Sequence, residues 1–268
     1  MSPVLSETAD GVALLTLHRP ERRNAYTREM GRALSEAYRA ANEDDAVRAI
    51  VVTGTPPAFC AGADMTAAGS TFDAPADDGF TASPISPAAF DLRTPVIAAV
   101  NGHAIGIGLT IAMQADLRIL AEDAKYAIPQ VRRGMMPDAM AHWTVPRIAG
   151  SAVAADVLIT GRTFDGREAL GMGLASRSLP AERVLPAAMG VAADIAANVS
   201  PLSAALTKRL LWDALRHGYS PERVAERETE GHLQVMGTED AREGGASFVE
   251  RRAPRFTSRI PRDWTGPS

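Results

Sequence analysis

The chain has 268 residues, of which 46% are hydrophobic and 22% charged, and its formal net charge is -4. This is the composition of an ordinary globular protein that can bury a sizeable core. The slight acidity does not suggest a nucleic-acid partner, and the single cysteine, Cys60, excludes an internal disulfide and a cysteine-based metal site. We expect no metal. The first residues lack a signal-peptide pattern and no apolar run approaches the ~18 residues of a membrane span, so we expect a cytoplasmic protein without a membrane partner.

The first half of the chain alternates strand-like and helix-like segments. Two short apolar runs, 4–5 and 12–17, are separated by Ala9-Asp10-Gly11, which predicts a β-hairpin. Thr27 is a candidate N-cap for a helix over 28–41. Strands separated by helical segments indicate a parallel-rich α/β core. The further strands are expected at 47–53, 96–100 and 117–120.

The segment 66–95 is rich in Ala, Gly, Ser, Pro and Asp and has no periodicity. We interpret it as a mobile loop close to the site, and the alternative is a passive insertion. From about residue 138 the pattern becomes helical, and Ser200 and Pro201 are typical of an N-cap followed by the first helical position. The expected helices cover 139–148, 151–160, 166–170, 181–198, 201–216, 220–236 and 239–250.

Two glycine-rich turns each follow a predicted strand. AFCAGAD (58–64) comes after the strand at 47–53, and NGHAIGIGL (101–109) comes after the strand at 96–100. The second turn predicts the start of a helix, whose free N–H groups attract negative charge. Two such turns facing each other could direct two N–H donors at one oxygen and form an oxyanion hole. Either turn alone could equally serve close packing, and neither matches a dinucleotide or phosphate-loop motif.

Together, in this order and spacing, these motifs resemble the crotonase superfamily of enoyl-CoA hydratases and isomerases. The resemblance covers nearly the whole chain, and its further motifs are HRPERRNAY (18–26), ADLRILAEDAKYAIPQ (115–130), GMMPD (134–138), VPRIAG (145–150) and LITGRTFDGREALGMGLASR (158–177). It implies an α/β fold with a spiral core of repeated ββα turns over residues 1–200. It also implies a C-terminal helical region, 201–268, that builds homotrimers or dimers of trimers.

The resemblance also implies an acyl-CoA thioester substrate, with coenzyme A present only as part of that substrate and no separate cofactor. The thioester oxygen is expected to accept hydrogen bonds from the backbone N–H groups of Ala63 and Ile107. Losing one such donor typically costs about 3–4 kcal/mol of transition-state stabilisation. Isoleucine at the second position still supplies the N–H, although relatives often have glycine there. Residues expected near the CoA nucleotide are Arg22, Arg23, Ala25, Ala61, Asp64 and Met65, although the two arginines could instead be a solvated surface pair.

The positions where hydratases of this family carry two glutamates are occupied here by Thr110 and Gln130. Neither side chain can act as a carboxylate, although both can hydrogen-bond a water or a substrate. A third acid position, used by some isomerases of the family shortly after a GxxP motif, holds Asp138. The alternative role of Asp138 is to cap the helix expected at 139–148. His142, four residues later, could assist the acid from the same helix face, and Trp143 could contribute an apolar surrounding that raises its pKa.

One carboxylate suffices to move a double bond from C3 to C2, because the same group can remove a proton from C2 and return it at C4. The best mechanistic fit is therefore Δ3,Δ2-enoyl-CoA isomerisation in fatty-acid metabolism, with Asp138 as acid and base. Two alternatives stay open. One is an enoyl-CoA hydratase that acts on 2-enoyl-CoA with a water held by Thr110, Gln130 and Asp138. The other is an acyl-CoA-binding protein without turnover.

Overall fold

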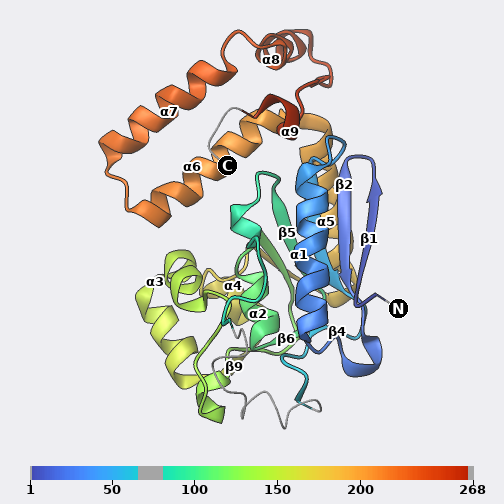
Figure 1. Cartoon of the computed structure of the whole chain (residues 1–268), viewed down its shortest axis with the longest axis vertical. Coiled ribbons are helices and arrows are strands. Elements are labelled where there is room, and N and C mark those ends of the chain that lie inside the picture. Colours follow the sequence, from blue (N-terminus) through green and yellow to red (C-terminus); the bar gives the residue numbers. More distant parts are fainter. Residues whose placement is uncertain (1, 66–80, 265–268) are drawn as a thin grey trace.

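A six-stranded sheet forms the centre of the protein, as the computed structural model shows for residues 2–65 and 81–264 (Figure 1). Its strands lie in the order β1-β2-β3-β5-β7-β10. β1 and β2 pair antiparallel as the expected hairpin, and every other neighbouring pair is parallel. The bounds are β1 Val4–Ala9, β2 Val12–Leu17, β3 Ala49–Gly54, β5 Val96–Val100, β7 Leu117–Ala121 and β10 Arg177–Leu179.

A second, smaller sheet has the order β4-β6-β8-β9. Its strands are β4 Ala58–Cys60, β6 His103–Ile105, β8 Tyr126–Ala127 and β9 Thr163–Phe164. Consecutive strands alternate between the two sheets, because β3, β5 and β7 enter the large sheet and β4, β6 and β8 enter the small one. The chain therefore winds as a spiral of repeated turns, which is the α/β architecture that the resemblance implied.

Most helices begin and end within two residues of the bounds that the sequence pattern predicted. α1 begins after Thr27, whose side chain accepts a hydrogen bond from the Met30 N–H, and α5 packs against five strands of the large sheet. The helices are α1 Arg28–Glu43, α2 Ile107–Ala112, α3 Ala141–Thr160, α4 Gly166–Gly171, α5 Ala181–Asn198, α6 Pro201–His217, α7 Pro221–Val235, α8 Glu239–Glu250 and α9 Ile260–Asp263. Within the described ranges no single helix is long and apolar enough to cross a membrane, and only α5 and α6 taken together, bent by 119°, have the required length and composition.

The two helices expected at 139–148 and 151–160 are confirmed as the two parts of α3, which are separated by a kink at the non-helical Gly150, although the first part begins at Ala141. Two other expectations need correction. Ser200 does occupy the N-cap of α6, but its hydroxyl donates to Asp240 and not to the helix. Residues 66–80 of the expected mobile loop lie outside the described residues, while 81–95 are largely packed into the protein. The buried side chains of that second part include Ile85, Ala88, Ala89, Phe90 and Leu92.

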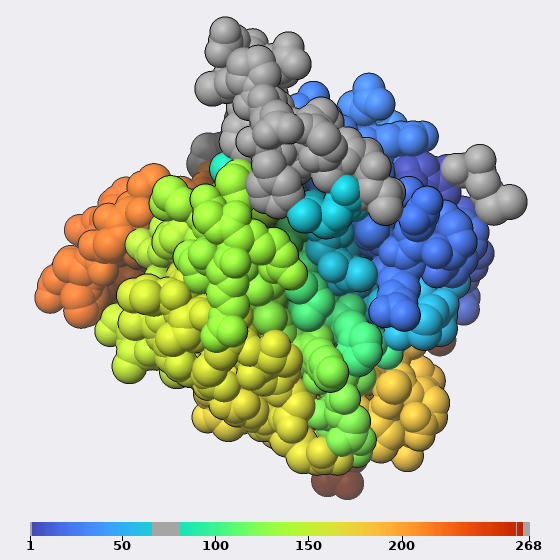
Figure 2. Space-filling model, turned by 90° about the horizontal axis from the view of Figure 1, so that it is seen from below, coloured from blue at the N-terminus to red at the C-terminus, as the bar shows by residue number. Residues whose placement is uncertain are grey.

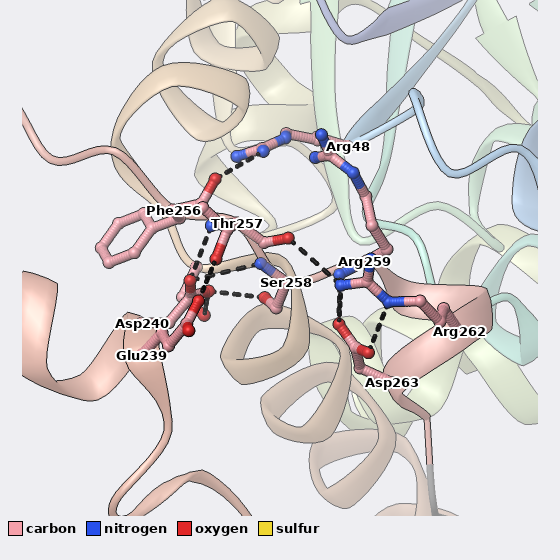
Figure 3. A network of polar contacts seen from close by, with 10 residues as sticks. Arg48, Glu239, Asp240, Phe256, Thr257, Ser258, Arg259, Arg262 and Asp263 are labelled. Atoms are coloured by element: carbon pink, nitrogen blue, oxygen red, sulfur yellow. Dashed lines mark hydrogen bonds and ion pairs between the residues drawn. The ribbon is translucent and has the colours of Figure 1, made fainter.

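Helices α6 to α9 gather at the end of the molecule opposite to α2, β4 and β6 (Figure 1). The tail that follows α8 is tied down by Asp240, whose carboxylate accepts hydrogen bonds from the backbone N–H groups of Thr257 and Ser258 and from the Ser258 hydroxyl (Figure 3). Arg48, which precedes β3, donates to the Phe256 carbonyl. These contacts join the C-terminal segment to the core, so the segments on either side of residue 200 are in direct contact.

Candidate active site

The two glycine-rich turns leave the small sheet side by side. β4 and β6 are parallel neighbours, and Cys60 on β4 is paired with Ala104 on β6. Ala63 and Ile107 each lie three residues beyond that pair. Because neighbouring parallel strands end at the same edge of a sheet, this register brings both turns to one place.

The backbone N–H of Ala63 points away from Tyr26, the residue with which Ala63 forms a parallel β-bridge. Tyr26 donates its N–H to the Gly62 carbonyl at 2.7 Å and accepts from the Asp64 N–H at 2.9 Å. This parallel bridge holds the residues on both sides of Ala63, so the N–H and C=O of Ala63 face away from Tyr26. In the described part of the chain the Ala63 N–H has no hydrogen-bond partner.

The second N–H lies at the start of α2. Ile107 is the first residue of this helix, and Gly106 forms its N-cap with a positive φ of 55°. The first N–H groups of a helix have no intrahelical acceptor. Among the described residues none accepts from the Ile107 N–H, while the Gly106 carbonyl accepts from Leu109 and Thr110. The turn therefore presents a free donor at a helix N-terminus, where negative charge is stabilised.

Glycine is required where the two turns touch. A Cβ on Gly108 would lie 2.5 Å from the Cys60 carbonyl oxygen, which no side chain tolerates. A Cβ on Gly62 would lie 3.0 Å from the Ile105 carbonyl oxygen, and the φ of Gly62 is +97°. The backbone of α2 thus packs directly on the end of β4. Burial raises the pKa of Cys60 to about 11, so this thiol is a packing group and not a thiolate nucleophile.

The three positions that the sequence singled out for acid chemistry come together beside these turns. Thr110 on α2 lies with its Oγ1 2.8 Å from Asp138 Oδ1. Gln130 begins the 3-10 helix η4, Gln130–Arg133, and its amide nitrogen lies 3.4 Å from where a Cβ on Gly106 would be. Gln130 is also one of the groups that stabilise the charged form of Asp138. The only carboxylate of the three therefore faces a hydroxyl and an amide.

Asp138 does not cap a helix, so the capping role considered for it is wrong. α3 begins at Ala141, and Ala139 and Met140 between them adopt left-handed backbone conformations with φ of 46° and 62°. Two such residues in succession are strained, and the surrounding structure must hold them. Gln114 on α2 donates its side-chain N–H to the Ala139 carbonyl at 3.0 Å. This turn directs the Asp138 carboxyl toward Thr110.

Burial raises the pKa of Asp138 above its ordinary value, and the hydrogen bond from Thr110 and the nearby Gln130 amide offset only part of that rise. In the part of the chain that the structure describes, Asp138 forms no ion pair that would counteract its burial. A carboxyl in this setting is a better general base than an exposed aspartate, since its pKa moves toward neutrality.

The auxiliary roles expected of His142 and Trp143 are not supported. Because α3 starts only at Ala141, Asp138 and His142 do not share a helix face, and His142 is exposed. The Trp143 ring packs in a tilted arrangement against Phe90 and Trp212, at ring-centroid distances of 5.0 and 5.8 Å.

The residues expected at the CoA nucleotide divide into three groups. Arg23 and Ala61 line a pocket beside the two turns. Arg22 and Met65 are exposed and do not line it. Ala25 is buried, and the Arg19 guanidinium bridges its carbonyl oxygen to the Asp64 carboxylate, 2.9 Å away.

This pocket has a volume of about 590 Å³ and a cationic lining. Besides Arg23, its basic side chains are Lys125, Arg132 and Arg133; His103 also lines it, and none of the lining side chains is acidic. It borders the turns at Ala61 and Ile105, and it extends over β8 and η4. Figure 2 looks at this end of the molecule, where the blue-to-cyan N-terminal segments meet the green-to-yellow middle of the chain. Among the described residues, no three His, Cys, Asp or Glu side chains come together as a metal site.

Residues 7–259 match the family model of enoyl-CoA hydratase/isomerase. The chain belongs to this family. It is 38% identical over 253 residues to enoyl-CoA hydratase ACTT3 of Alternaria alternata, a match covering 92% of this chain and 83% of the relative. It is 35% identical to the probable enoyl-CoA hydratase echA8 of Mycobacterium tuberculosis, covering 96% and 98%. A solved structure of a probable enoyl-CoA hydratase/isomerase from Mycobacterium abscessus is 58% identical, with a TM-score of 0.93 and coverage of 96% and 99%.

Within this enoyl-CoA hydratase/isomerase chain, sequence reasoning missed the cationic residues of the pocket beyond Arg23. Lys125 lies in the motif at 115–130, and Arg132 and Arg133 follow it closely. Only the structure shows that these three side chains line one pocket. A usable signal was the excess of basic residues over 125–133, which contains three cations and no acid. Such an excess at a site expected to bind a phosphorylated carrier could have been interpreted as a phosphate-binding patch.

Proposed function

We propose that this member of the enoyl-CoA hydratase/isomerase family isomerises 3-enoyl-CoA thioesters to 2-enoyl-CoA thioesters. The observation that carries the proposal is the single carboxyl group of Asp138, which is half-buried, has a raised pKa and lies 2.8 Å from Thr110. Isomerisation needs one acid/base group, while hydration in familiar relatives uses two glutamates. Thr110 and Gln130 occupy those two positions here.

In the proposed reaction the thioester oxygen accepts hydrogen bonds from the Ala63 and Ile107 N–H groups. Asp138 removes a proton from C2, and the electrons of that C–H bond form an enolate whose negative charge rests on the thioester oxygen. The enolate then re-forms the carbonyl while the C3=C4 double bond takes the proton back at C4. The double bond ends between C2 and C3, and Asp138 returns to its carboxylate form. No water or redox partner is consumed.

The cationic pocket supports a CoA thioester as the substrate. Arg23, Lys125, Arg132 and Arg133 surround a space that adjoins both turns. A phosphorylated carrier entering this pocket would meet positive charge at its phosphates while its thioester lies at Ala63 and Ile107. We therefore place the phosphates of coenzyme A near these side chains, and we propose no other cofactor.

A second candidate function is hydration of a 2-enoyl-CoA. The specific observation in its favour is Gln130, whose side-chain N and O atoms are both buried without a hydrogen-bond partner. Such an amide can hold a water by donating to it and accepting from it. Asp138 would take a proton from that water as its oxygen adds to C3, and would then deliver this proton to C2, which returns Asp138 to its carboxylate form. The relatives from Alternaria and Mycobacterium are named as hydratases. A third possibility is binding of acyl-CoA without turnover.

We further propose a cytoplasmic homo-oligomer, a trimer or a dimer of trimers, with residues 1–200 as core and 201–268 as the oligomer-building region. Large apolar side chains on the C-terminal helices support this proposal, because they are more than 60% exposed in the single chain. They are Leu233, Met236, Phe248 and Val249.

The test is to supply the purified protein with a 3-enoyl-CoA and, separately, with a 2-enoyl-CoA, while following the absorbance of the conjugated thioester. A gain of absorbance from the first substrate supports isomerisation. A loss from the second alone supports hydration and contradicts our proposal. No change in either, together with saturable binding of an acyl-CoA by calorimetry, indicates a binding protein.

A further inference from the structure

Trp212 of helix α6 is fixed against the central sheet. The residue is 5% exposed, and its indole Nε1–H donates to Asp116 Oδ1 at 2.7 Å. The other carboxylate oxygen, Asp116 Oδ2, accepts from the Val96 N–H at the start of β5 and from the buried Lys208 ammonium, at 2.7 and 2.8 Å. Because Asp116 directly precedes β7, this network holds the indole at the ends of two neighbouring strands.

The indole packs into a triangle of aromatic rings. Its centroid lies 5.3 Å from that of Phe90 and 5.8 Å from that of Trp143, and the Phe90 and Trp143 rings are 5.0 Å apart. Phe90 belongs to the segment 81–91, to which Lys208 also donates a hydrogen bond at the Ala89 carbonyl, and Trp143 lies in the first turn of α3. The three rings belong to a hydrophobic cluster separate from the main core. This cluster therefore joins α6 to the segment and to α3.

The turn that carries the acid is held by the same two parts of the chain. The Ala139 N–H donates to the Ala82 carbonyl, in the segment 81–91, at 2.6 Å. The Met140 carbonyl accepts from the N–H of Trp143 at 2.9 Å. Ala139 and Met140 are the two left-handed residues, and such strained residues keep their conformation only where their surroundings hold them. The position of the acid thus depends on the two parts of the chain that the rings bring together.

Removing the indole would leave a cavity between α6, α3 and the segment 81–91, which neighbouring side chains would partly fill. The rings of Phe90 and Trp143 would then shift, and the backbone that holds the turn would shift with them. Catalytic groups tolerate little of such movement, because a displacement of about 1 Å can cost about 10²-fold in rate.

We propose that Trp212 is a positioning residue of the active site, which keeps the Asp138 carboxyl at the Thr110 hydroxyl. The proposal rests on the proposed role of Asp138 as the acid/base group. It assigns to the C-terminal helical region a part in that site.

Two substitutions of Trp212 separate the ring contact from the hydrogen bond. Trp212→Leu removes both, while Trp212→Phe loses the N–H and keeps an aromatic ring for the triangle. We expect Trp212→Leu to lower kcat for 3-enoyl-CoA isomerisation by about 10–10²-fold with a nearly unchanged KM, and Trp212→Phe to stay within about threefold of the wild type. Leu202→Ala is the matched control, because Leu202 is similarly buried in α6 but lies outside the ring cluster. It should lower the melting temperature and leave kcat unchanged.

The pH profile of kcat distinguishes positioning from a merely structural role. Burial raises the pKa of Asp138, so a loosened turn that admits water should lower this pKa, and the acidic limb of the Trp212→Leu profile should move to lower pH. Tyr26 and Cys60, two titratable groups that interact with the Asp138 charge, have pKa values of about 12 and 11 and stay neutral at the acidic limb. A wild-type kcat in folded Trp212→Leu, or an acidic limb that stays in place or moves to higher pH, would overturn the inference.

Melting curves test the inference without catalysis. At neutral pH the gain in melting temperature from Asp138→Asn reflects how far burial raises the Asp138 pKa in the folded protein. This gain should therefore be smaller in the Trp212→Leu background than in the wild-type background, and equal gains would contradict the positioning role. If the wild-type protein does not isomerise 3-enoyl-CoA, the proposed function fails, while these melting curves still decide whether Trp212 positions Asp138.

Discussion

Thr110 Oγ1 lies 2.8 Å from Asp138 Oδ1, and this contact joins α2 to the strained turn before α3. The Thr110 side chain is fully buried, and its hydroxyl also lies 3.2 Å from the Ile107 carbonyl oxygen. A hydroxyl has one proton to donate, so it serves one of the two acceptors, and the shorter contact is the one to Asp138. Thr110, which occupies one of the two positions where a glutamate was expected, thus holds the carboxyl group of Asp138 in place.

Replacing Asp138 with asparagine tests the acid/base role. Asparagine keeps the shape of the side chain but cannot take up the C2 proton, so we expect Asp138→Asn to lower kcat for 3-enoyl-CoA isomerisation by about 10²–10⁴-fold. Binding of a saturated acyl-CoA should change little, because the Ala63 and Ile107 donors are unaffected. Isomerisation at the wild-type rate would rule out Asp138 as the base.

The same substitution should increase stability at neutral pH. Burial raises the pKa of Asp138 in the folded protein above its value of about 3.9 in an unfolded chain. A raised folded-state pKa contributes stability that is fully present below the unfolded pKa and is lost as pH rises through the folded pKa. The asparagine side chain does not titrate. The variant should therefore melt at a higher temperature than the wild type above the folded-state pKa of Asp138, and this difference should shrink in acid. Melting curves from pH 3 to 8 measure this difference, and a difference independent of pH would contradict it.

Thr110→Val should shift the pH dependence of the reaction. The Thr110 hydroxyl lowers the pKa of Asp138, so removing it lets burial raise that pKa further. Because the base must be ionised, the acidic limb of the kcat profile should move to higher pH. Thr144→Val is the matched control, since Thr144 is equally buried but bonds the Met140 carbonyl and not Asp138. The hypothesis fails if both variants keep the wild-type profile.

Gly108→Ala should damage the site through geometry alone. The added Cβ would lie 2.5 Å from the Cys60 carbonyl oxygen, so α2 must move away from β4 and take the Ile107 N–H with it. A lost oxyanion donor typically lowers kcat by about 10²–10³-fold. Gly190→Ala on α5 has open space around the new Cβ and a favourable helix propensity, so it should leave the rate unchanged. Equal rates for both variants and the wild type would show that the position of α2 does not matter.

Lys125→Gln tests the cationic pocket. Lys125 lines the pocket and is exposed, so we expect its loss to raise KM for a CoA thioester about tenfold while leaving kcat nearly unchanged. The effect should weaken as salt is added, because salt screens exposed charges. Arg183→Gln, an exposed cation on α5 outside the pocket, serves as the control and should leave KM unchanged. An unchanged KM for Lys125→Gln at low salt would show that the phosphates of coenzyme A do not bind at this part of the pocket.

The sequence by itself determined the elements and the two turns. The Asp10-Gly11 hairpin, the Thr27 cap and the strand Val96–Val100 follow from local chemistry, because turn residues, capping oxygens and apolar periodicity act within a few residues. The glycines of both turns were visible for the same reason. Their order along the chain was enough to indicate the family, and the family model matches residues 7–259.

Only the tertiary structure decided which side chains share the site. Asp138 and His142 do not lie on one helix face, because α3 begins only at Ala141. The residues before it, Ala139 and Met140, adopt left-handed conformations that the helical sequence pattern did not predict, and Gln114 bonds the Ala139 carbonyl. Thr110 meets Asp138 across 28 residues, and Lys125, which precedes β8, and the arginines of η4 share a pocket with Arg23 through the packing of the small sheet. Such contacts depend on how strands stack between two sheets. Local patterns carry no information about that stacking, so the surroundings of the acid could be established only in three dimensions.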